Sequence, residues 1–165
     1  MKSIILFRHG KSDWNADYDK DHDRPLKNRG IKAAKKMGQL LSKKKETPDL
    51  IISSTALRTK STAELAKEAG AWIANIKYDR KIYEGTIDKI ISIIQLQNNK
   101  HKTICLVGHE PTLSSFIYRI NKVIYIKFPT AAMARIDFKV MQWRKIKLHK
   151  DQSRINWFIK PKDIN

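Results

Sequence analysis

Two histidines and two arginines stand where they could handle an anion. They are Arg8, His9, Arg58 and His109, and each lies at or shortly after the end of an apolar run. A guanidinium group presents a planar fork of donors that matches phosphate oxygens, and a neutral imidazole can accept a phosphoryl group covalently. Taken singly, each is more simply a surface charge or a loop histidine. The prediction of a phosphoryl site therefore depends on all four residues converging.

The apolar runs that precede these residues are typical of buried β-strands. Lys2–Arg8, Asp49–Ser54 and Thr103–Gly108 show no helical period. Helical patterns follow them, from Gly30 to just before Pro48, over residues 56–69, and from Pro111. This alternation predicts a mostly parallel sheet with helices on both faces. Ligands of such sheets bind beyond the carboxyl ends of the strands, so we expect the four residues at one rim.

The remaining segments complete the prediction of a three-layer αβα sandwich. Residues 13–29 are polar and indicate a loop, residues 76–78 a short strand, and residues 87–96 another helix. After Pro129 the pattern becomes β-rich, and we expect neighbouring strands over residues 132–140, 142–148 and 155–159. Because no linker or internal repeat is evident, residues 1–165 are expected to form a single domain.

Composition excludes several classes of protein. The 165 residues include 34 Lys and Arg against 16 Asp and Glu, a net charge of +18. The simplest explanation is a solvated lysine-rich surface, although the excess also suggests phosphate or nucleic acid as a partner. The lone Cys105 excludes an internal disulfide and favours a reducing compartment. No apolar run approaches the roughly 18 residues of a membrane helix, so we expect a cytoplasmic protein without a membrane segment.

The placement of two site residues supports an anionic ligand independently. Arg58 falls in the first turn of its predicted helix, where the helix dipole disfavours a cation unless an anion is bound nearby. His109 precedes a helix start, where backbone N–H groups can receive phosphate. The cluster offers neither the carboxylates of a magnesium site nor the thiols of a tight zinc site, so no metal is expected.

Longer motifs surround these residues. They are Arg8-His9-Gly10-Lys11-Ser12-Asp13-Trp14-Asn15, Ser53-Ser54-Thr55-Ala56-Leu57-Arg58-Thr59-Lys60-Ser61-Thr62-Ala63, Tyr83-Glu84 and Val107-Gly108-His109-Glu110-Pro111. Together they resemble the histidine phosphatase superfamily, which includes the cofactor-dependent phosphoglycerate mutases, and the resemblance covers about residues 2–120. Within the superfamily, the chain is most similar to SixA-like phosphohistidine phosphatases. That similarity lies in its short length, its Gly-His-x-Pro ending, and Asp23-Arg24-Pro25-Leu26 followed by Arg29-Gly30.

The resemblance implies roles for the site residues. His9 would attack phosphorus and become phosphorylated. The phosphoryl oxygens would be bound by Arg8, Arg58 and His109, which would also stabilise the charge of the transition state. Glu84 matches the position at which many members place the general acid. No cofactor is implied.

Four residues keep alternative interpretations. Asn15 matches a phosphate-contacting asparagine of the mutase branch and Ser12 lies in the same loop, but ordinary turn chemistry explains both equally well. Glu84 could equally be a surface glutamate in a loop. Glu110 stands where SixA-like sequences often carry Asn, so it either points outward, tunes the accepted substrates or caps the helix that follows.

We therefore expect a metal-independent phosphatase that works through a phosphohistidine intermediate. Its partner would be a phosphorylated protein, such as a histidine-phosphotransfer domain, or a small phosphorylated compound. A mutase is disfavoured because the compact chain leaves little room for a covering lid. The alternative is an inactive phosphatase fold that binds nucleic acid or other polyanions, with Trp143, Trp157 and Phe158 as stacking groups. We favour strand packing for these aromatics. The presence of Arg8, His9, Arg58 and His109 together also argues against the alternative, because an inactive site would have no chemical use for all four.

Overall fold

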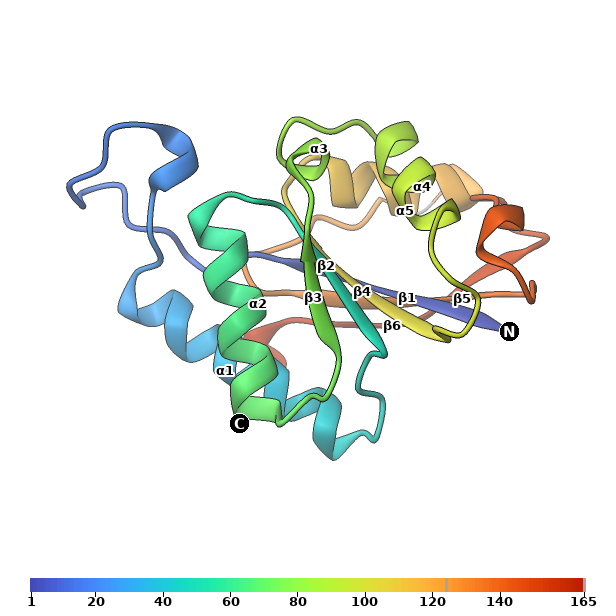
Figure 1. Cartoon of the computed structure of the whole chain (residues 1–165), viewed down its shortest axis with the longest axis horizontal. Helices are drawn as coiled ribbons and strands as arrows, with labels where there is room; N and C mark the ends of the chain where they lie inside the picture. The colour runs from blue at the N-terminus through green and yellow to red at the C-terminus, as the bar shows by residue number, and fades with distance from the viewer. Residues whose placement is uncertain (124, 165) are drawn as a thin grey trace.

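A six-stranded sheet forms the centre of the fold (Figure 1). The structure is a computed structural model that describes residues 1–123 and 125–164. The strands follow the order β3-β2-β4-β1-β5-β6 across the sheet. The first four run parallel to one another, and the last two close one edge in antiparallel pairing. Their bounds are β1 (Lys2–Arg8), β2 (Leu50–Ser53), β3 (Asn75–Tyr78), β4 (Thr103–Gly108), β5 (Met133–Phe138) and β6 (Ser153–Ile159).

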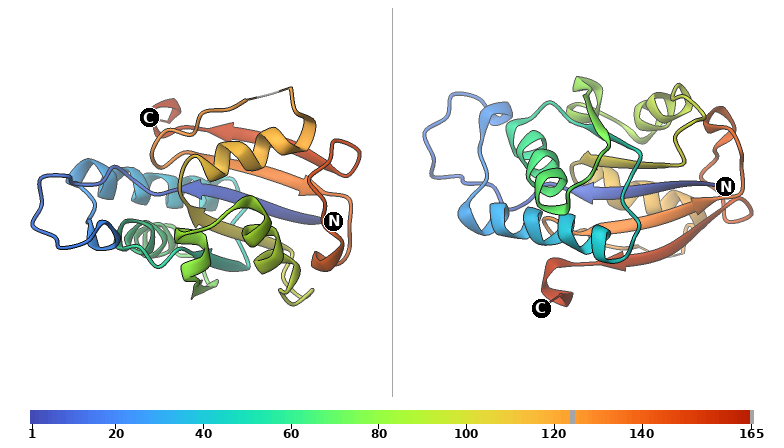
Figure 2. Two further views of the ribbon diagram at one scale, coloured as in Figure 1. Left: turned by 90° about the horizontal axis from the view of Figure 1, so that it is seen from above. Right: turned by 60° about the horizontal axis from the view of Figure 1, so that its bottom comes forward.

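Helices cover both faces of this sheet (Figure 2). One face carries α1 (Asn28–Lys43) and α2 (Leu57–Gly70), which pack against each other. The other face carries α3 (Arg80–Tyr83), α4 (Ile87–Gln95) and α5 (Thr112–Asn121). Short 3-10 helices lie in two of the connections, η1 (Asp21–Asp23) and η2 (Trp143–Lys145), and another, η3 (Pro161–Asp163), follows β6. The predicted α/β architecture with helices on both faces is therefore confirmed.

Alternation along the buried strands builds two cores, one on each side of the sheet. In β1, Ile4 and Leu6 face the core under α4 and α5, whereas Ile5 and Phe7 face the core under α1 and α2. All four side chains are fully buried. Because side chains alternate between the two faces of a strand, a sheet covered on both faces needs apolar residues at every position. This requirement explains the continuous apolar runs of the sequence.

The boundaries of most elements agree with the sequence prediction, but residues 142–148 do not form a strand. Trp143 instead begins η2 and its side chain is fully buried. Its backbone N–H donates to Asn99 Oδ1 at 2.9 Å, and its indole Nε1 donates to the carbonyl of His101 at 2.9 Å. These bonds tie the segment to the connection between α4 and β4, so β5 pairs directly with β6. The prediction of a middle strand was wrong because a buried tryptophan produced the apolar pattern.

The C-terminal aromatic residues pack within the fold. Trp157 Nε1 donates to Glu46 Oε2 at 2.9 Å, and the ring of Phe158 lies 5.2 Å from that of Phe128. The contacts of Trp157 and Phe158 agree with the strand-packing interpretation, whereas Trp143 is buried in η2 and not in a strand. Cys105 is buried in the core. Among the described helices, none combines the length and apolar character needed to cross a membrane.

Candidate active site

The pairing of β1 with β4 places the two predicted histidines at one rim. Arg8 is in register with Gly108, and the His9 N–H donates to the Gly108 carbonyl at 3.3 Å. On the other side of β4, the N–H of Ser54 donates to the Val107 carbonyl at 3.1 Å, which brings the start of α2 to the same rim. A cavity of about 510 Å³ opens there. Its lining consists of Arg8, His9, Lys11, Ser12, Trp14, Asp21, Arg24, Arg58, Tyr83, His109, Glu110 and Thr130.

His9 has the protonation state of a nucleophile. Its side chain is buried, and its Nδ1 lies 2.7 Å from the carbonyl oxygen of Gly10. A carbonyl oxygen can only accept a hydrogen bond, so Nδ1 carries the proton and the lone pair lies on Nε2. Burial above all, together with the charges of Arg8, Arg58 and Arg24, lowers the pKa of His9 from 6.5 to about 4, against the opposing effect of the Gly10 bond. The imidazole is therefore neutral at physiological pH.

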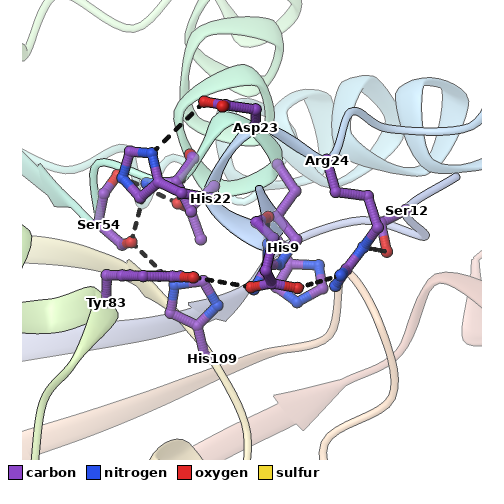
Figure 3. A network of polar contacts seen from close by, with 12 residues as sticks. His9, Ser12, His22, Asp23, Arg24, Ser54, Tyr83 and His109 are labelled. Carbon is purple, nitrogen blue, oxygen red and sulfur yellow. Dashed lines mark hydrogen bonds and ion pairs between the residues drawn. The ribbon is translucent and has the colours of Figure 1, made fainter. Parts of the chain in front are cut away.

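His109 faces His9 across the cavity. The two ring centroids lie 5.4 Å apart, and Figure 3 shows both rings in the same pocket. The Nε2 atom of His109 lies 2.8 Å from Ser54 Oγ, which fixes the orientation of the ring. Burial lowers the pKa of His109 to about 3, with the charge of His9 as the next cause. Its Nδ1 has no hydrogen-bond partner within the described part of the chain, so this nitrogen is available to a ligand.

Arg8 and Arg58 each present an unused donor in the buried interior of the site. Arg8 Nη1 donates to the Phe128 carbonyl at 2.8 Å, and Arg58 Nη1 donates to the Asp21 carbonyl at 2.9 Å. The Nε atoms of both arginines are buried and make no hydrogen bond to any described residue. Since buried donors in proteins are nearly always paired, these two atoms are suited to donate to an anionic ligand.

Glu110 contacts both the start of α5 and the segment whose carbonyl binds Arg8. Its carboxylate accepts the N–H of Ser114 at 2.8 Å and the hydroxyl of the same residue, at the start of α5. It also accepts the N–H of Phe128 at 3.4 Å, and the carbonyl of Phe128 is the one that Arg8 uses. Of the alternatives left open by the sequence, the helix-capping role matches these contacts.

The site also contains residues that sequence reasoning did not assign to it. Arg24 is buried, donates through Nε to Ser12 Oγ at 2.9 Å, and lies 3.6 Å from the ring centroid of Trp14. Asp21 forms ion pairs with both Arg24 and Arg58. The signal for Arg24 was present in the Asp23-Arg24-Pro25-Leu26 motif. Asp21 had no comparable signal, because it belongs to a run of acidic loop residues.

The loop that carries Asp21 and Arg24 is closed at its base. Ser12 and Leu26 form an isolated antiparallel bridge, and the N–H of Asp13 donates to the Pro25 carbonyl at 2.8 Å. The intervening chain therefore folds back over the rim of the sheet and returns η1 to the cavity. Sequence patterns showed a polar loop here without indicating this return.

Two glycines let the loop lie directly on α1. A Cβ atom built on Gly10 would lie 2.6 Å from the Gly30 carbonyl oxygen, and one built on Gly30 would lie 2.2 Å from the Lys11 carbonyl oxygen. Neither position has space for a larger residue. The close approach explains why Arg-His-Gly and Arg-Gly both occur in the sequence.

Two predicted residues lie outside the cavity. Asn15 is exposed, and its N–H donates to Asp13 Oδ1 at 3.0 Å in a turn. The side chain of Glu84 is 58% exposed and forms an ion pair with Arg80 at 3.3 Å. Its neighbour Tyr83 points into the cavity instead. The structure thus brings together Arg8, His9, Ser12, Arg58 and His109 from the predicted set, and it leaves out Asn15 and Glu84.

Comparison with known proteins agrees with the fold and the motifs. Residues 4–90 match the family model of the histidine phosphatase superfamily (branch 1). The uncharacterized protein Rv1276c of Mycobacterium tuberculosis is 32% identical over 138 residues, which cover 77% of this chain and 84% of that protein. The chain therefore belongs to the histidine phosphatase superfamily.

Among solved structures, SixA proteins have a fold similar to that of this chain. The putative phosphohistidine phosphatase SixA from Agrobacterium tumefaciens is 26% identical, with a TM-score of 0.80 over 97% of this chain and 98% of that one. The protein histidine phosphatase SixA complexed with tungstate has the same fold, with 18% identity and a TM-score of 0.82 over 98% of both chains. The chain is SixA-like. Within the described residues, no group of three or more His, Cys, Asp or Glu is placed to hold a metal ion.

Proposed function

We propose that this protein is a phosphatase that transfers a phosphoryl group to Nε2 of His9 and then to water. One observation carries the proposal: a buried, neutral imidazole with its lone pair on Nε2 shares a cavity with two arginines whose buried Nε donors are unused. The guanidinium groups would neutralise the phosphoryl oxygens during the transfer, as phosphoryl-transfer enzymes require.

The two displacements balance without a metal ion. In the first, the lone pair of His9 Nε2 forms a bond to phosphorus and the bond from phosphorus to the leaving group breaks. The phosphorylated ring is then cationic, and its Nδ1 proton remains bonded to the Gly10 carbonyl. In the second, water attacks phosphorus, the P–N electron pair returns to Nε2, and the product leaves as dihydrogen phosphate.

The carboxylates near the cavity favour a phosphohistidine substrate. Hydrogen bonds and ion pairs with Tyr83 and Arg58 lower the pKa of Asp21 to about 2 against the desolvation that raises it, so Asp21 is ionised. Glu110 is engaged by Ser114, and Glu84 lies outside the lining. The ionised Asp21 has no proton to give to an ester oxygen, and the other two carboxyl groups are held by Ser114 or lie outside the cavity lining. A phosphorylated imidazole needs no such acid, because its distal nitrogen can already carry a proton when the P–N bond breaks.

A basic groove beside the active site favours an acidic phosphoprotein as the partner. The groove has a volume of about 210 Å³ and shares Lys11 and Thr130 with the catalytic cavity. Its charged lining residues are Lys11, Arg29, Lys160 and Lys162. Among the described residues, none of these four cations forms an ion pair with a carboxylate. Unpaired charges of one sign attract a partner of the opposite sign and accelerate its association.

The test compares wild type with His9→Asn on p-nitrophenyl phosphate and on N-phosphohistidine, both in the presence of a chelator. The asparagine amide can still donate to the Gly10 carbonyl but has no nucleophilic nitrogen. We expect the wild type to turn over and to form an acid-labile, alkali-stable phosphoenzyme, and the variant to do neither. Equal turnover by the two proteins would remove His9 from the mechanism.

A further inference from the structure

The half-exposed carboxylate of Asp21 lines a site built for anions. Its Oδ2 accepts from Arg58 Nη2 at 3.1 Å and from the Tyr83 hydroxyl at 2.8 Å, and its Oδ1 accepts from Arg24 Nη1. Its backbone carbonyl accepts a further bond from Arg58 Nη1. Four hydrogen bonds from three side chains therefore fix this one residue, which belongs to the short helix η1.

These contacts place the carboxylate close to the two histidines. Tyr83 and Arg24 lie on opposite sides of His9 in Figure 3, and Asp21 bonds to both of them. The ring of Tyr83 also lies 5.6 Å from that of His109. Asp21 thus lies in the cavity lining between Tyr83 and Arg24.

The unused donors show that Asp21 does not occupy the whole anion site. Arg58 binds Asp21 through its Nη atoms, whereas its Nε and the Nε of Arg8 remain free. A phosphoryl group can therefore bind at the Nε atoms while Asp21 stays on Arg58 and Arg24. In that complex a fixed negative charge stands beside the phosphoryl group. It opposes a group that departs as an anion and favours one that is cationic while it is still bonded to phosphorus.

We propose that Asp21 is a specificity-determining residue, which binds the protonated leaving group of an N-phosphorylated side chain and so selects phosphoramidates over phosphate esters. The proposal rests on the function proposed above. The distal ring nitrogen of a phosphohistidine substrate carries the proton, and its N–H faces the Asp21 carboxylate. When His9 Nε2 bonds to phosphorus, the P–N electron pair returns to the substrate ring, which leaves as neutral imidazole with that proton retained.

In the proposed reaction, each of the two imidazole rings bonded to phosphorus donates its remaining N–H to a hydrogen-bond acceptor of the protein. The carboxylate of Asp21 accepts from the cationic ring of the substrate, and the Gly10 carbonyl accepts from the cationic ring of phosphorylated His9. The carboxylate is the stronger acceptor of the two, because it carries a full charge. It also raises the pKa of the substrate ring, so the reactive protonated form persists to higher pH.

The experiment compares Asp21→Asn with Asp23→Asn, a matched control in the same turn. Asp23 lies outside the cavity lining, and its side chain is 58% exposed. The substrates are N-phosphohistidine and p-nitrophenyl phosphate. We expect the ratio of kcat/KM on N-phosphohistidine to kcat/KM on the ester to fall in D21N by on the order of 10- to 100-fold, the range for a hydrogen bond to a charged group. D23N should resemble the wild type on both.

The pH profile gives a second readout that a merely structural role would not change. The alkaline limb of kcat/KM on N-phosphohistidine should lie at lower pH in D21N than in the wild type, with no such shift on the ester. Equal losses on both substrates, or an unshifted limb, would overturn the proposal. If D21N does not fold, the pH profile of the wild type alone tests the proposal. An alkaline limb of kcat/KM that lies no higher than the pKa of free N-phosphohistidine would overturn the proposed role of Asp21. If wild type and His9→Asn are equally active on both substrates, the proposed function itself has failed.

Discussion

The neutral state of His9 can be tested through the stability of the protein. In the unfolded chain an imidazole takes up a proton near pH 6.5, whereas burial lowers the pKa of His9 in the fold to about 4. Between these values the unfolded state binds more protons than the folded state. Stability contributed by His9 is therefore fully present above about pH 6.5 and is lost progressively as the pH falls toward 4.

The size of the effect follows from the shift. A pKa difference of one unit corresponds to about 1.4 kcal/mol, so the full change for His9 is about 3 kcal/mol, of which about 2 kcal/mol is lost by pH 5. The side chain is only 6% exposed, so solvent screening reduces this figure little. His9→Asn removes the titrating group and can retain a donor to the Gly10 carbonyl.

The assay is urea denaturation of both proteins at about pH 7.5 and about pH 5. We expect the free energy of unfolding to fall by about 2 kcal/mol more in the wild type than in the variant. The same substitution at the exposed His149 serves as the control. An identical pH dependence in wild type and His9→Asn would refute the burial argument, and with it the reason for a neutral nucleophile at physiological pH.

Four further substitutions test other parts of the structure. Arg58→Lys should lower kcat/KM on p-nitrophenyl phosphate by on the order of 100-fold, because an ammonium group cannot contact both Asp21 and a phosphoryl group as a guanidinium does; wild-type kinetics would contradict this. Glu84→Gln should change kcat by less than about threefold, since the side chain is exposed, and a loss of 10²-fold or more would restore it as the general acid. Lys162→Glu should slow reaction with an acidic phosphoprotein more than with p-nitrophenyl phosphate, and added salt should narrow the difference; equal slowing on both would argue against the basic groove as the docking surface. Gly30→Ala should destabilise the protein by about 1–3 kcal/mol in thermal or urea unfolding, because its Cβ would overlap the Lys11 carbonyl, and an unchanged midpoint would show that the loop can move aside.

Local patterns were sufficient for most of the architecture. The continuous apolar runs of β1 and β4 predicted buried parallel strands, because a strand covered on both faces needs apolar residues at every position. The same reasoning failed at Trp143, where one buried aromatic imitated a strand. Apolar periodicity indicates which residues of a segment are buried, but it does not determine which backbone groups will form hydrogen bonds with that segment.

For the site, the sequence by itself predicted that His9 and His109 would lie at one rim, because the carboxyl ends of parallel strands share a rim. That β1 and β4 are neighbouring strands was decided by the tertiary structure. The family motifs added their expected roles. Only the tertiary structure decided which neighbours these residues have. The side chain of Glu84 is exposed at the surface, whereas that of its neighbour Tyr83 lines the cavity. Asp21 lines the cavity because its loop is closed at the base by the bridge between Ser12 and Leu26. Such placements depend on contacts between residues far apart in the chain, which spacing along the sequence does not encode. The net charge of +18 and its sign follow from the composition alone. Only the fold places four of the cations, Lys11, Arg29, Lys160 and Lys162, in one groove beside the cavity.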